Sequence, residues 1–397
     1  MLRIRFEDTH PKGVITQKFI EQYFDISKVR KIVIEEGITI IENHLFENMR
    51  TIEEVELPDS LIVIGIHAFY DCKCLRNINF GRKLKRIEFA AFANCKSLEA
   101  VDFSLCPDCD IAKSVFSFCS SLSNVILPAN LNILDEFLFS ACNSLTNIEI
   151  PETINIIYNN VFTCCESLES IYIPDNIIEI DATFSGCSGL TNVRLSRNLR
   201  IIEESAFKYC ESLVSMYVKR EDFGKILFPD SLETISEYAF HGCSKILMIR
   251  FPRYIQEIEN HAFEECLSLQ TVIFDNGNHG IILVPNIFKN CACLEYVLLP
   301  ESIRPHDLFP VNETPRYVFS SEPNPECNTY IQEQLESKRI KDKFRNLRQK
   351  FSEYLNPKLR HPLSFGIMLS YMSDFNNTID ENMEYSRYHR IVETILS

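Results

Sequence analysis

Sixteen cysteines are the residues of this chain whose type and spacing are best suited to chemistry. A cysteine can act as a metal ligand, as a nucleophile or as half of a disulfide. Many of them, however, occupy one position of the pattern F-x-x-C-x-x-L-x-x-V-x-F, as in AFANCKSLEAVDF at 91–103. Ten share that position: Cys72, Cys95, Cys119, Cys142, Cys165, Cys187, Cys210, Cys243, Cys266 and Cys291.

The regular spacing of these ten cysteines argues against a chemical role. The ligands of a zinc ion converge on one point, whereas cysteines that recur once per unit form a line. A catalytic thiol has no reason to recur in every unit, and free cysteine packs as a small apolar residue. Neighbouring units would place two cysteines about 5 Å apart, within reach of a disulfide, but parallel side chains are poorly oriented for one. We therefore expect buried free thiols.

The other chemical motifs are weaker. Cys106-Pro-Asp-Cys109 is a C-x-x-C motif, but a zinc knuckle needs a second pair of ligands, and none lies at a diagnostic spacing. The nine histidines do not cluster, and we find no phosphate-binding glycine loop, zinc-hydrolase motif, nucleophile elbow or kinase signature. We expect a turn at Cys106 to Cys109, and a protein with no metal, no cofactor and no enzymatic activity.

The cysteine pattern belongs to a repeat that fills most of the chain. Its phenylalanine returns every 22 to 25 residues, apart from one interval of 33 between Phe207 and Phe240. The unit FSACNSLTNIEIPETINII at 139–157 contains L-x-x-I-x-I, whose alternation predicts a short strand that the following proline ends. One unit cannot bury its own apolar face, so successive units must stack into a solenoid with a continuous parallel sheet.

These units resemble the leucine-rich repeats of the BspA type, on residues such as AFHGCSKILMIRFP at 239–252. The resemblance implies an α/β solenoid with its parallel β-sheet on the concave face, and it implies adhesion and cell-surface roles for some members. About twelve repeats span 23–303, after an N-terminal cap at 1–22. The glycine that the family often has before A-F is largely absent from this chain.

The solvent-facing residues of the predicted strands form rows along the concave face, which is the usual ligand surface of leucine-rich repeat proteins. The N-terminal half of these rows is acidic and rich in amides, whereas the C-terminal half carries tyrosine and arginine, which are frequent at interface hot spots. An insertion of about ten residues, Lys219 to Phe228, begins at the edge of this patch. The alternative is a solvated sheet surface with a tolerated insertion. The candidate binding residues are Tyr172, Arg194, Tyr217, Arg250, Ile273, Tyr296 and Leu298, with Lys219, Arg220 and Phe223 from the insertion.

The chain changes character after the repeats. Residues 304–327 are rich in proline and predict an irregular linker or cap, and the spacing of apolar residues predicts a helical region over 328–397. This region could cap the last repeat, form a separate or dimerising domain, or bind a membrane surface or nucleic acid through its basic first helix. Because the end of a solenoid needs covering, we favour the cap.

Charge and hydropathy limit the function classes. A net charge of −15 disfavours broad attraction to nucleic acid or anionic membranes, and no apolar run is long enough to cross a membrane. The first residues carry charges where a secretory signal would be apolar. We expect a cytoplasmic, non-catalytic scaffold that binds another protein through the concave face, with self-association through the C-terminal helices as a further option. The alternatives are a cell-surface adhesion or antigen protein exported by a non-classical route, and a regulatory protein whose C-terminal helices carry the activity.

Overall fold

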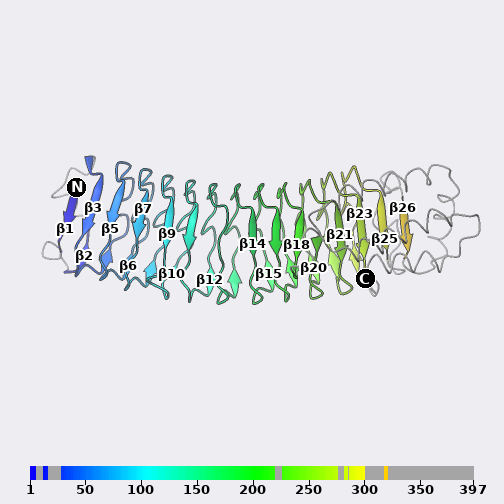
Figure 1. Ribbon diagram of the computed structural model, residues 1–397, viewed down its shortest axis with the longest axis horizontal. Helices are drawn as coiled ribbons and strands as arrows, with labels where there is room; N and C mark the ends of the chain where they lie inside the picture. Colours follow the sequence, from blue (N-terminus) through cyan, green and yellow to red (C-terminus); the bar gives the residue numbers. More distant parts are fainter. Residues whose placement is uncertain are drawn as a thin grey trace, which may run out of the picture.

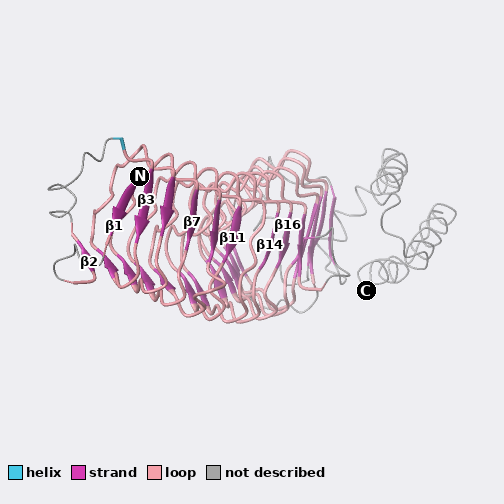
Figure 2. Cartoon of the chain, turned by 60° about the vertical axis from the view of Figure 1, so that its left-hand side comes forward, coloured by secondary structure: helices cyan, strands magenta, loops and turns pink. Residues whose placement is uncertain are grey.

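The computed structural model describes residues 1–5, 12–16, 28–219, 226–275, 281–284, 286–299 and 317–320. These residues form an elongated parallel-strand solenoid of about 11 turns, shown from two directions in Figure 1 and Figure 2. The described residues contain no α-helix, so the helical part of the expected α/β class is wrong for this portion of the chain. None of them forms a helix with the length and apolarity needed to span a membrane. The predicted helical region at 328–397 lies outside the described residues.

The strands stack in two rows, which we call the first row and the second row. The first row contains a six-stranded and an eight-stranded sheet, and the second row contains sheets of five, two and five strands. The first row consists of β1 (Leu2–Ile4), β3 (Lys31–Ile34), β5 (Glu54–Glu56), β7 (Asn77–Asn79), β9 (Ala100–Asp102), β11 (Asn124–Ile126), β14 (Ser170–Tyr172), β16 (Asn192–Arg194), β18 (Ser215–Tyr217), β19 (Ile226–Leu227), β21 (Met248–Phe251), β23 (Thr271–Phe274), β25 (Tyr296–Leu299) and β26 (Tyr317–Ser320).

The second row was not predicted from the sequence. Its two-residue strands end at the last apolar position of each unit, such as Ile157, which is 6% exposed. They are β2 (Val14–Ile15), β4 (Ile40–Ile41), β6 (Val63–Ile64), β8 (Arg86–Ile87), β10 (Asp110–Ile111), β12 (Ile133–Leu134), β13 (Ile156–Ile157), β15 (Glu179–Ile180), β17 (Ile201–Ile202), β20 (Thr234–Ile235), β22 (Glu257–Ile258) and β24 (Ile282–Leu283).

The core between the two rows is organised by the phenylalanine of each unit. Ten stacked pairs link eleven rings from Phe46 to Phe288, with centroid distances of 4.9 to 5.8 Å between successive rings. Nearly all of these rings are fully buried. Since aromatic pairs at this separation attract one another beyond their area burial, the ring stack also favours the in-register arrangement of units.

The segment around each stacked phenylalanine is a run of turns, and two positions have positive φ in every unit except that of Phe184, which has one. These positions lie two residues before and two residues after the ring, as in Phe137 (φ 56°) and Ala141 (φ 58°) around Phe139. The second position is Gly186 in one unit and Gly242 in another, and both have positive φ. Most units therefore hold non-glycine residues in the left-handed region, which costs about 1–2 kcal/mol per residue. This geometry explains how the turns form although glycine is scarce.

Strands extend beyond the predicted limits of the repeats at both ends. Within the predicted cap at 1–22, β1 pairs with β3 and β2 pairs with β4, so each row gains a strand there. Within the predicted linker at 304–327, the backbone of β26 pairs with β25. Part of the expected irregular linker is therefore regular sheet.

The insertion is not only a surface loop. Its last residues form β19, which lies between β18 and β21 in the first row. In the second row β17 pairs directly with β20, and Phe207 stacks directly on Phe240 at 5.3 Å. The insertion thus adds one strand to one side of the solenoid only, and Phe228 packs beneath it at 8% exposure.

Candidate functional site

The candidate binding residues of the strands lie on the outward face of the first row, where alternate residues of each strand point away from the core. The register places Arg194 beside Tyr172 on one side and beside Tyr217 on the other. Exposure falls along this line towards the C-terminal end: Tyr172 is 40% exposed, whereas Ile273 and Leu298 are 8% and 9% exposed. The accessible part of the predicted patch is therefore its N-terminal end.

Tyr172 is held in place by Arg194. The guanidinium carbon of Arg194 lies 4.3 Å from the centre of the Tyr172 ring. Arg194 Nη1 donates to Ile173 O at 3.0 Å and to Asp175 Oδ1 at 2.7 Å, and Nη2 donates to Asp175 Oδ2 at 3.3 Å. The Arg194 side chain is 12% exposed. Arg194 therefore fixes the orientation of the tyrosine ring more than it offers a charge to a partner.

Asp175 partly neutralises the positive charge of the arginines next to Tyr172. Its carboxylate accepts a hydrogen bond from the Arg197 backbone N–H at 3.1 Å and pairs with Arg197 Nε at 2.7 Å. Burial opposes ionisation of Asp175, but the hydrogen bonds and charges of Arg194 and Arg197 outweigh it and lower its pKa. The carboxylate is charged at neutral pH, so these three side chains carry one net positive charge beside the Tyr172 ring, mostly on the exposed Arg197.

Tyr217 and Arg250 do not lie on adjacent strands, which corrects the sequence-based order of the patch. Met216 pairs with Ile226, and Leu227 pairs with Arg250, so Leu227 lies between the two predicted residues. Leu227 is half-buried. The sequence pattern did not predict this position of Leu227, because β19 lies within the insertion and the insertion does not follow the repeat period.

The remaining candidates are spread over different surroundings. Tyr296 is 8% exposed, and Arg250 Nε donates to Asp275 Oδ1 at 2.7 Å. Lys219 is exposed at the start of the insertion, whereas Arg220 and Phe223 lie outside the described residues. The structure thus brings Tyr172, Arg194 and Tyr217 together at an accessible surface, and it buries Ile273, Tyr296 and Leu298.

Ile126 is a residue of this surface that the sequence-based selection missed. It is one of the two outward residues of β11 and is 44% exposed. It lies two units before Tyr172 on the same face, which is a separation of about 10 Å at the usual strand spacing. An exposed isoleucine at an outward position of the repeat was the available signal.

The ten repeated cysteines are free thiols, nine of them buried and Cys291 partly buried, and each has the same kind of hydrogen-bond partner. Each thiol Sγ donates to the backbone carbonyl of the phenylalanine in the preceding unit, at distances of 3.0 to 3.4 Å. Burial raises the pKa of Cys72, Cys119 and Cys165 to about 12. The thiol is therefore a hydrogen-bond donor inside the core. The sequence analysis treated it only as a small apolar residue and did not predict this hydrogen bond.

The C-x-x-C motif forms a turn, as predicted. Both thiols are 1% exposed, and the Cys109 N–H donates to Cys106 O at 3.1 Å. A hydrogen bond from the Cys109 side chain lowers the pKa of Cys106, and the same contact together with burial raises that of Cys109. The contact between the two thiols thus favours ionisation of Cys106 over ionisation of Cys109, in a site that solvent barely reaches.

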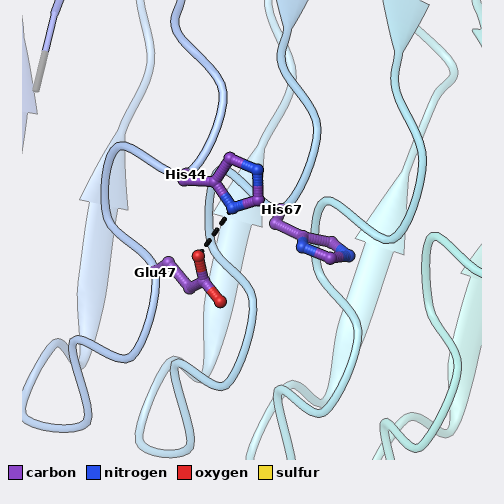
Figure 3. A group of neighbouring side chains, drawn as sticks. All are labelled: His44, Glu47 and His67. Carbon is purple, nitrogen blue, oxygen red and sulfur yellow. Dashed lines mark hydrogen bonds and ion pairs between the residues drawn. The ribbon is translucent and has the colours of Figure 1, made fainter.

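The expectation that the histidines do not cluster is wrong for one pair. His44 and His67 are 23 residues apart and occupy the same position of successive units, so stacking brings their rings to a centroid distance of 5.0 Å (Figure 3). Glu47 completes the group, and the potential ligand atoms of the three residues lie within 4.8 Å of one another. The signal in the sequence was that His44 and His67 are separated by one repeat period, which places them side by side when the units stack.

The comparison with known families agrees with this geometry. The profile described as "BspA type Leucine rich repeat region" matches in 6 copies, over residues 17–106, 109–226 and 215–309. The chain belongs to the BspA-type leucine-rich repeat family. This BspA-type assignment confirms the resemblance inferred from the A-F-x-x-C units.

Solved structures of similar shape include bacterial leucine-rich repeat proteins. One from Bacteroides ovatus has 23% identity and a TM-score of 0.50, with 80% of this chain and 91% of that chain covered. A leucine rich cell surface protein from Faecalibacterium prausnitzii has 19% identity and a TM-score of 0.42, with 82% and 85% covered. The first likeness supports the BspA-type solenoid fold. No curated protein matches the sequence.

Proposed function

We propose that this BspA-type solenoid is a non-catalytic binding protein that holds a protein partner on the outward face of the first row. The proposal places the contact at β11, β14, β16 and β18, where the accessible candidate residues lie. Its centre is Tyr172, with Ile126 on one side and Tyr217 on the other. Arg197 adds an exposed positive charge at the edge.

The observation that carries the proposal is the fixed orientation of an exposed aromatic ring. Tyrosine is enriched at interface hot spots, and a ring that is already ordered loses less entropy on binding. Here the ring rests on Arg194, and Asp175 fixes Arg194 through two hydrogen bonds. Burial, and then a hydrogen bond to Glu152, raise the pKa of the Tyr172 hydroxyl, so it stays protonated at neutral pH.

The test compares two tyrosines with nearly equal exposure on different sides of the solenoid. Tyr172 is 40% exposed on the first row, and Tyr158, which directly follows β13 of the second row, is 43% exposed. A photo-crosslinking amino acid at position 172 should capture a discrete partner in cells, and the same amino acid at position 158 should not. The captured partner is then purified for equilibrium measurements.

The affinity of the purified partner decides the proposal. A hot-spot tyrosine contributes at least about 2 kcal/mol, so Tyr172→Ala should weaken binding by about 30-fold. Tyr158→Ala should leave the affinity unchanged. Equal affinities for the two variants would reject the first-row surface, and loss of binding only with Tyr158→Ala would move the site to the second row.

A further inference from the structure

The group formed by His44, Glu47 and His67 has the composition of a transition-metal site. His44 Nδ1 lies 2.7 Å from Glu47 Oε2, and the potential ligand atoms of all three residues lie within 4.8 Å of one another. Two imidazoles and one carboxylate are typical ligands of zinc. Figure 3 shows the three side chains on two neighbouring turns, with His44 and Glu47 directed towards each other.

The backbone fixes the positions from which the two imidazoles extend. His44 and His67 both have positive φ, 60° and 51°, in equivalent turns. The His44 N–H donates to Ile66 O at 2.7 Å, so the first turn is bonded directly to the second. The His67 N–H donates in turn to Phe89 O at 3.0 Å. The two histidines are therefore anchored on bonded turns and keep the same separation as long as the repeats stay stacked.

The His67 ring is further restrained by aromatic neighbours. Its centroid lies 4.9 Å from that of Tyr70 and 5.2 Å from that of Phe89. The His44 side chain is 49% exposed and the Glu47 side chain 27% exposed, so two of the three ligands can adjust. Zinc–ligand bonds of 2.0–2.2 Å in a tetrahedron separate ligand atoms by about 3.4 Å. This spacing requires the partly exposed His44 and Glu47 side chains to rotate, and solvent access leaves the fourth position to water.

The charges that face the group favour a cation. Burial lowers the pKa of His67, which favours the neutral imidazole that a metal binds. Glu47 supplies a negative charge.

A second His-x-Phe-Glu sequence in the chain provides an internal comparison. His261 Nδ1 lies 3.1 Å from Glu264 Oε2, the same spacing along the chain as His44 and Glu47. There, however, Lys289 Nζ lies 3.1 Å from Glu264 Oε1. The ammonium group compensates the carboxylate and would repel a divalent cation. The two groups therefore share a motif but differ in the lysine that pairs with the second carboxylate.

We propose that His44, Glu47 and His67 bind a zinc-class divalent metal ion that links two neighbouring turns near the N-terminal end of the solenoid. Two ligands come from one unit and one comes from the next, so bound metal ties the units together. Anything that binds the folded form alone stabilises it, and the melting temperature should therefore rise with metal concentration. Protons compete with the metal for the imidazole nitrogens, so both effects should weaken at acidic pH.

The test uses the full chain and Co²⁺ as a spectroscopic probe for zinc, after removal of metals with a chelator. A site made of imidazole and carboxylate gives visible d–d bands without the sulfur-to-cobalt charge-transfer band of a thiolate site. We expect one equivalent of Co²⁺ with such a spectrum, displaced by Zn²⁺. His44→Gln and Glu47→Gln should each weaken binding by at least tenfold while the apo proteins keep the wild-type melting temperature.

Two control variants separate this site from other ligands. His261→Gln changes the second motif and should leave binding unchanged. Replacement of the exposed cysteines 74, 164 and 293 by serine should also leave it unchanged. The proposal is overturned if the wild type gives no such spectrum, if His44→Gln and Glu47→Gln bind Co²⁺ as tightly as the wild type, or if the cysteine variant alone loses binding.

Discussion

The line of buried cysteines predicts a strong difference in reactivity between neighbouring thiols. Cys164 is exposed, whereas the next residue, Cys165, is fully buried. Burial raises the pKa of Cys165 from an ordinary 9.0 to about 12. Only the thiolate reacts with alkylating reagents, so this shift of three pKa units alone reduces the reactive fraction of Cys165 by about a thousandfold. Steric protection adds to this factor, because the reagent must wait for the unit to open.

The assay is alkylation of the native protein with iodoacetamide at pH 7.5, followed by denaturation, isotope-labelled alkylation and mass spectrometry. Cys164 and Cys165 lie on one peptide, so each serves as the reference for the other. Cys72, which is buried, and Cys74, which is exposed, provide a second comparison of the same kind. Cys74 and Cys164 should be labelled at least a hundred times faster than their buried partners, and all four should react equally in guanidinium.

The result that would refute the reasoning is native labelling of Cys165 within tenfold of the rate at Cys164. Such a rate would mean that the thiol is not enclosed between the phenylalanine turns, or that the turns open freely. Disulfides between successive buried cysteines under non-reducing conditions would also contradict it. They would remove the donor to the phenylalanine carbonyl and would point to an oxidising compartment.

Two further predictions concern single residues of the turns. Ala141→Gly should stabilise the protein by about 1 kcal/mol in denaturant titrations, because Ala141 has a φ of 58°. The control variant Ala129→Gly changes an exposed turn residue outside the positive-φ positions and should destabilise the protein by about 0.5–1 kcal/mol. Burial, and then neighbouring carboxylates, raise the pKa of Glu203 in the folded protein, so its charge opposes folding above that pKa. Glu203→Gln should therefore raise the melting temperature at pH 7, and the difference should vanish as the pH falls to about 4.5. Equal melting temperatures at pH 7 would contradict this sign.

The sequence predicted the parts of the fold that depend on one repeated unit. The period of the phenylalanines, the strand in L-x-x-I-x-I and the burial of the cysteine position all follow from apolar spacing, because each unit must cover the next. The conformation of the opposite side of the coil did not follow from apolar spacing. A-F-x-x-C forms turns with positive φ rather than a helix, and the local pattern of these residues does not encode that choice.

The candidate surface was predicted only in part, since exposure depends on what surrounds a strand and not on its position in the unit. Tyr172 and Ile126 are exposed as an outward position implies. Ile273 and Leu298 occupy equivalent positions and are buried. The contact between Arg194 and Asp175 joins residues 19 positions apart, which no repeat-period argument connects. The histidine group, in contrast, follows directly from the period once stacking is known.

The insertion at 219–228 provides the last prediction, because the structure shows that only one side of the solenoid uses it. The first row gains β19, which separates Tyr217 from Arg250 by two strand spacings, about 10 Å. The second row and the phenylalanine stack contain no residue of the insertion, since β17 pairs directly with β20 and Phe207 stacks directly on Phe240. Deleting residues 219–228 joins Val218 to Pro229 and restores the regular period.

We expect the deletion variant to fold cooperatively with a modestly lower melting temperature, since it loses the burial of Ile226 and Phe228 but keeps the stack of Phe207 on Phe240. Removing ten residues from a regular unit, 196–205, should instead disrupt both rows and abolish the cooperative transition. Circular dichroism melts of the two deletions compare these outcomes directly. If both deletions unfold the protein to the same extent, β19 is a necessary part of both sides of the solenoid, and the one-sided insertion is wrong.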